Sequence, residues 1–192
     1  MSRSVENKII EATVECIEEY GLQNTTSRRI GKKAGVNSAA INYYFRSKDV
    51  LMERVMEVTL NNAFCWEDYK HTEELGLKEQ LYKIFSHLAS SALRFPKISQ
   101  AHLYDVMTEY RDDLPVLTPI TDFMNKILEE ICRKEPGITR DRAYDIVMQL
   151  MSSVVFYYVM LPKIYDRFCG RDMSRSSVME KYIRNVIDTL LK

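Results

Sequence analysis

Apolar residues recur at helical spacing along almost the whole chain of 192 residues, and no stretch sustains the alternation of a β-strand. Six glycines and five prolines leave room for long, uninterrupted helices. Glycine, proline and capping residues divide the pattern into nine expected helices, over residues 5–20, 26–34, 38–45, 48–66, 77–95, 103–110, 115–135, 139–161 and 179–190. The sequence therefore predicts an all-α protein of about nine helices.

The second and third expected helices are short and meet at a tight turn. Gly35 can adopt a positive φ that strains other residues, and Val36 can be buried beneath the turn. Ile30, Ile41 and Phe45 are spaced to form a small core with the first helix. This pattern predicts a helix-turn-helix whose second helix has an exposed face that fits the major groove of DNA.

Charge is distributed unevenly around this motif. The whole chain carries 27 basic and 27 acidic residues, so its formal net charge is zero. Between residues 26 and 48, however, every ionised side chain is a cation, namely Arg28, Arg29, Lys32, Lys33, Arg46 and Lys48. Six like charges alone are usually a solvated face. Combined with a helix-turn-helix, they predict docking against the phosphates of double-stranded DNA.

The same region resembles a known family of regulators. Residues 25–51 read TTSRRIGKKAGVNSAAINYYFRSKDVL, with a paired threonine, an Ala-Gly-Val turn, an aromatic pair ending in phenylalanine, and Ser-Lys-acidic-x-Leu. This stretch resembles the TetR-family signature, and the close resemblance covers about residues 9–55. The resemblance implies a helix-turn-helix DNA-binding domain over residues 1–47 and a helical ligand-binding and dimerisation domain over residues 48–192.

The resemblance also implies roles for individual residues. Phosphate contacts are expected from Thr26, Tyr43, Tyr44 and Lys48, which would fix the position of the protein on DNA without reading sequence. A base-facing surface is expected from Asn37, Ser38, Ala39 and Asn42, with Ser27 beside it, and Arg28 or Arg29 could reach a guanine edge. For each of these residues a solvated or phosphate-only role remains open, and one of the two tyrosines is expected to face inward.

Two positions depart from the family pattern. Gly31 stands where the family usually has alanine, which should weaken the second helix by up to about 1 kcal/mol. Asn42 stands where many members have tyrosine, so the base preference of this chain should differ from theirs.

The segment 146–161 is apolar on most of its faces, and Ser152 and Ser153 are small enough to let another helix approach. We expect the last two helices of each subunit to form a homodimeric four-helix bundle, as the resemblance implies, although this segment could instead be the core helix of a monomer. A dimer would read a palindromic operator with half-sites about 34–36 Å apart.

The body of the chain is rich in methionine and aromatic residues. Such residues usually form core, but the resemblance implies a cavity for a small-molecule inducer, and an apolar or aromatic molecule would suit it. The expected lining residues are Trp66, Tyr82, Phe85, Tyr104, Met107, Met124 and Phe156. Asp105, Glu109 and Arg111 could reach a charged ligand. The sequence does not identify the inducer, and it predicts no cofactor.

Other classes of function are disfavoured by the sequence. The three histidines and four cysteines are scattered, and the chain has no nucleophile motif, phosphate-binding glycine loop or metal-ligand spacing, which argues against an enzyme. No signal peptide is recognisable, and residues 148–161 are too short to span a bilayer, so a cytoplasmic protein is expected. A repressor is expected, because repression needs only occupancy of a promoter. Two alternatives remain open: the protein could activate transcription, or it could be controlled by a protein partner instead of a small molecule.

Overall fold

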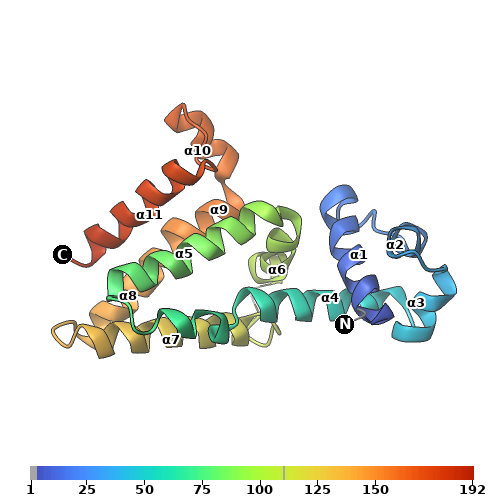
Figure 1. Ribbon diagram of the computed structural model, residues 1–192, viewed down its shortest axis with the longest axis horizontal. Helices are drawn as coiled ribbons and strands as arrows, with labels where there is room; N and C mark the ends of the chain where they lie inside the picture. The colour runs from blue at the N-terminus through green and yellow to red at the C-terminus, as the bar shows by residue number, and fades with distance from the viewer. Residues whose placement is uncertain (1–3, 110) are drawn as a thin grey trace. The chain divides into compact units, whose positions relative to one another are not determined.

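The computed structural model describes residues 4–109 and 111–192, and within them all regular structure is helical (Figure 1). The elements in chain order are α1 (Val5–Tyr20), α2 (Ser27–Ala34), α3 (Ser38–Phe45), α4 (Lys48–Ala63), the 3₁₀ segment η1 (Trp66–Thr72), α5 (Leu77–Arg94), α6 (Pro96–Glu109), α7 (Leu117–Lys134), α8 (Arg140–Leu150), the π segment η2 (Met151–Phe156), α9 (Tyr157–Met160), α10 (Pro162–Cys169) and α11 (Ser176–Leu190). The predicted all-α class is confirmed.

Two elements are additional to the nine that the sequence predicts. The segment η1 occupies part of the expected connection after residue 66, and α10 begins at Pro162, where the sequence predicted only a loop. Pro162 is the first residue of α10, a position at which proline loses no helical hydrogen bond. The expected helix over residues 139–161 is the continuous run of α8, η2 and α9.

The contacts divide the chain into two compact units. The N-terminal unit comprises residues 1–62 and 95–111, and the C-terminal unit comprises residues 63–94 and 112–192. Helix α6 therefore belongs to the N-terminal unit, although α5 and α7 on either side of it in the chain belong to the C-terminal unit. The predicted functional boundary between residues 47 and 48 stays a prediction.

One apolar core holds the N-terminal unit together. Ile9 and Ile17 of α1, Ile30 of α2 and Ile41 of α3 are fully buried in it, and Ile98 of α6 completes it. Helix α1 packs against both α2 and α6. Burying side chains of this size contributes about 1.5–3 kcal/mol each, so the core fixes the orientation of α1, α2 and α3 relative to one another.

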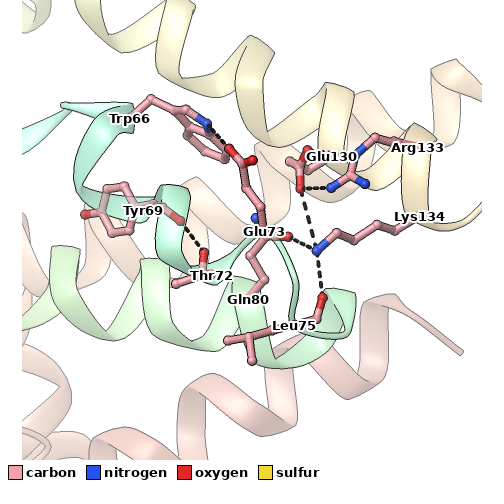
Figure 2. Close-up of polar contacts among 9 residues, drawn as sticks. All are labelled: Trp66, Tyr69, Thr72, Glu73, Leu75, Gln80, Glu130, Arg133 and Lys134. Atoms are coloured by element: carbon pink, nitrogen blue, oxygen red, sulfur yellow. Dashed lines mark hydrogen bonds and ion pairs between the residues drawn. The ribbon is translucent and has the colours of Figure 1, made fainter.

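In the C-terminal unit, α5 is the central helix and packs against α7, α9, α11 and η2. Polar contacts tie α7 to the first turn of α5 and to the loop before it, and the same loop holds η1 (Figure 2). The largely buried ammonium group of Lys134 donates to the carbonyl of Leu75 at 2.7 Å and to Oε1 of Gln80 at 2.6 Å. Trp66 Nε1 donates to Glu73 Oε1 at 3.2 Å, which anchors η1 to the following loop.

The run Arg140–Met160 is long and apolar enough to cross a membrane by length and composition alone. Such a stretch is only weak evidence for a membrane-spanning helix, because the core helix of a folded domain can have the same length and composition. Ala143, Ile146, Val147, Leu150 and Val154 of this run are buried in the C-terminal unit. They account for one of its apolar faces.

Candidate nucleic-acid interface

The turn between α2 and α3 has the geometry that the sequence predicts. Gly35 adopts a left-handed conformation with φ +70° and ends α2, and its N–H donates to the carbonyl of Gly31. The N–H of Val36 donates to the same carbonyl at 2.9 Å. Asn37 then begins α3 by accepting a hydrogen bond from the N–H of Ala40 at 2.9 Å. The end of α2 and the start of α3 are thus both capped by hydrogen bonds from within the turn.

Gly31 has a packing role that the sequence did not reveal. A Cβ atom built on this buried residue would lie 2.9 Å from the carbonyl oxygen of Val36 and 3.5 Å from the amide nitrogen of Ser38. Real Cβ atoms essentially never approach backbone oxygen so closely. Glycine therefore lets α2 lie against the start of α3, which sets the position of α3 in the unit.

The outer face of α3 is exposed along its length. Ser38, Ala39 and Asn42 are exposed, as their predicted base-facing role requires. Tyr43 is 82% exposed and Tyr44 is 44% exposed, and their rings meet edge to face at 5.1 Å. The expectation that one of the two tyrosines faces inward is wrong, because Ile41 and Phe45 already supply the buried face of this short helix.

Asn37 is committed in part to the backbone. Its Oδ1 atom accepts the capping bond of α3, and its amide nitrogen can still donate hydrogen bonds to a ligand. Thr26 makes the equivalent contact at the start of α2, where its hydroxyl accepts from the N–H of Arg29 at 3.3 Å. The hydroxyl of Thr26 can still donate to a phosphate oxygen while it accepts this bond.

A shallow hollow of about 490 Å³ lies at the start of α2, and its lining consists of Gln23, Asn24, Thr26, Arg28, Arg29 and Lys32. Arg28 and Lys32 are exposed there, so their charges are available to an anion. Gln23 and Asn24 were missed by the sequence analysis. Their polar character one turn before Thr26 was the available signal, but nothing in the sequence indicated that the chain folds back to that surface.

Two of the six cations are held by other side chains. Lys33 forms ion pairs with Glu15 at 3.2 Å and Glu19 at 2.9 Å, both on α1, and these carboxylates raise the pKa of its ammonium group. The guanidinium carbon of Arg29 lies 4.2 Å from the ring centre of Tyr20, and the same group donates to the carbonyl of Asn24. Arg28 is therefore better placed than Arg29 to reach DNA.

Lys48 is the first residue of α4 and is half-buried. Ser47 caps this helix, since its hydroxyl accepts from the N–H of Val50 at 3.2 Å. The amides of the first turn and the ammonium group of Lys48 together offer positive charge to a phosphate oxygen. Arg46 connects α3 to α4 with a φ of +65°, a conformation that few side chains adopt, so the loop between these helices is tightly constrained.

The seven predicted ligand-binding residues are distributed over both units. Tyr104 and Met107 lie on α6 in the N-terminal unit, and both are exposed. Phe156 of η2 is also exposed. The side chains of Asp105 and Glu109 lie outside the described part of the structure.

The other four residues lie in the C-terminal unit. Phe85 is fully buried in its core, Met124 of α7 is half-buried, and Trp66 packs against Phe123 with ring centres 5.8 Å apart. The guanidinium carbon of Arg184 lies over the ring of Tyr82, 3.7 Å from the ring centre. The ligand-binding role of all seven residues stays a prediction.

The tight turn between α2 and α3 and the exposed outer face of α3 give the N-terminal unit the geometry of a helix-turn-helix. Residues 9–55 match the family described as bacterial regulatory proteins, tetR family. This match confirms the resemblance to the TetR family that the sequence of this region indicates.

A relative with similar sequence is the HTH-type transcriptional regulator BetI 1 of Chromohalobacter salexigens, which is 43% identical over 53 residues. That match covers 28% of this chain and 26% of the relative, so the chain spans about a quarter of the curated relative that it matches.

Solved structures are similar over nearly the whole chain. A transcriptional regulator from Aquifex aeolicus VF5 has a TM-score of 0.68 and 17% identity, and covers 97% of this chain and 99% of its own. A TetR variant from Acinetobacter baumannii AYE in complex with minocycline has a TM-score of 0.57 and 16% identity, and covers 95% of this chain and 92% of its own. At these identities the likeness concerns the fold.

Proposed function

We propose that this chain is a homodimeric transcription regulator that binds double-stranded DNA and acts most simply as a repressor. The observation that carries the proposal is the outer face of α3, where Ser38, Ala39, Asn42 and Tyr43 are exposed at the end of a tightly built turn. Base readout would come from Ser38, Ala39 and Asn42 on this face, while Thr26, Tyr43, Tyr44 and Lys48 would hold phosphates. Activation instead of repression remains the alternative.

Dimerisation is supported by an apolar surface on the run of α8, η2 and α9. Tyr144, Met148 and Phe156 are exposed there, with Met148 60% exposed to solvent. Exposed apolar patches of this kind mark interaction sites. We propose that this run and α11 pair with their counterparts in a second copy, so that two α3 helices meet successive half-sites of a palindromic operator.

Control by a small molecule is the favoured regulatory mechanism. The structurally similar TetR variant that holds minocycline supports this for the fold, and the aromatic interior of the C-terminal unit favours an apolar or aromatic effector. A protein partner in place of a ligand is the second candidate. In either case the chain acts by binding rather than by catalysis, and we propose that it works in the cytoplasm.

The salt dependence of DNA affinity tests the proposed surface. Lys48→Ala should weaken binding to all duplexes and reduce the slope of log K against log salt by up to about one unit. Lys33→Ala is the matched control, because it removes the same charge from a side chain already paired with Glu15 and Glu19. Equal slopes for Lys48→Ala and the unmodified protein would remove Lys48 from the phosphate contacts.

Asn42 tests base readout separately. Duplexes selected from random DNA by the unmodified protein and by Asn42→Ala should share half-site spacing and differ in the preferred bases. Identical selected sequences would exclude Asn42 from readout. If no duplex is bound with salt-sensitive affinity, the proposed function itself is wrong.

A further inference from the structure

The exposed apolar side chains of the C-terminal unit gather on one continuous stretch of chain. In the described part of this unit, every large apolar side chain that is exposed lies on the run of α8, η2 and α9 or on α10. None of the described residues of α10 is buried. The set consists of Tyr144, Met148, Phe156, Ile164, Tyr165 and Phe168. Such a gathering of exposed apolar side chains indicates a surface that binds a partner.

The exposed residues of the run follow a spacing of four, with Tyr144, Met148, Ser152 and Phe156 all exposed. In an α-helix of about 3.6 residues per turn, side chains four apart drift steadily around the axis. The π segment η2 counters this drift, because its hydrogen bonds reach the fifth residue and its turns are therefore wider. The four side chains thus stay close to one line along the run.

This line is symmetric about Ser152. Met148 and Phe156 lie four residues on either side of Ser152, and Tyr144 and Met160 lie eight residues on either side. A two-fold interface has this symmetry, since residue i of one copy contacts residue j of the other and j contacts i. Two runs that cross antiparallel at Ser152 would pair Met148 with Phe156 twice, and the small serine side chains would let the helices approach.

The crossing of two such runs is too small to make a stable interface by itself. Stable interfaces use about 20–30 residues from each partner, whereas the run exposes three large apolar side chains. Helix α10 follows the run directly (Figure 1) and exposes three more, with Ile164 64% and Phe168 82% exposed. An interface that includes α10 therefore doubles the apolar contribution.

Charge indicates which part of a second copy fits α10. The side chain of Lys163 is 95% exposed, and Arg167 on the next turn is exposed as well. The nearest printed acid, Asp166, lies 4.0 Å from Lys163 and also accepts a hydrogen bond from the N–H of Met173. Two α10 helices that met each other would bring these cations together, which is unfavourable.

Discussion

Replacing Gly31 with alanine separates two opposing effects at the turn of the helix-turn-helix. In an ordinary helix interior, alanine is more favourable than glycine by about 1 kcal/mol. Here the new Cβ would lie 2.9 Å from the carbonyl oxygen of Val36, a backbone atom that cannot rotate away. Overpacking of this kind costs about 1–3 kcal/mol. We therefore expect Gly31→Ala to lower the free energy of unfolding by about 1 kcal/mol.

Thermal and urea unfolding followed by circular dichroism measure this effect. A loss of about 1 kcal/mol corresponds to a decrease in Tm of about 2–4 °C for a chain of this size. DNA affinity should fall as well, because relief of the contact moves Val36 and, with it, the capped start of α3 at Asn37.

Gly76→Ala is the control, since its Cβ would have no neighbour within 4 Å and its φ is not positive. Its stability should stay within about 0.5 kcal/mol of the unmodified protein, as for most surface substitutions. A Gly31→Ala protein that is more stable than the unmodified protein would refute the packing argument. Helix propensity would then outweigh the close approach of α2 to the turn.

Three further predictions concern other parts of the molecule. Burial lowers the pKa of His102 from 6.5 to about 4, so between these values the unfolded chain binds a proton that the folded chain does not; stability should fall as the pH drops from 6.5 to 4, and His102→Gln should lose this part of the dependence in urea titrations. Met148→Glu should convert dimers to monomers in sedimentation experiments, whereas the same change at the exposed Thr121 of α7 should not; a dimeric Met148→Glu protein would contradict the proposed interface. Tyr43→Ala should leave stability within about 0.5 kcal/mol, because its side chain is exposed and its printed ring contact is with the exposed Tyr44, while duplex affinity decreases; unchanged affinity would exclude Tyr43 from the interface.

The sequence by itself determined the helical class and the helix-turn-helix, because both depend on local patterns. Apolar spacing specifies which face of each helix is buried, and Gly35 specifies a turn that few other residues can make. The capping residues Thr26 and Asn37 are also local, and the structure finds them at the helix starts that the sequence indicated. Interactions within a few residues suffice for all of these features.

Only the tertiary structure decided which cations are available and which helix joins the DNA-binding unit. Lys33 and Arg28 are equivalent in the sequence, yet one is paired with Glu15 and Glu19 of α1 and the other is exposed. The grip of Glu18 on the start of α6 joins residues about 80 positions apart. No local pattern encodes such contacts, because they exist only after the cores have brought distant helices together.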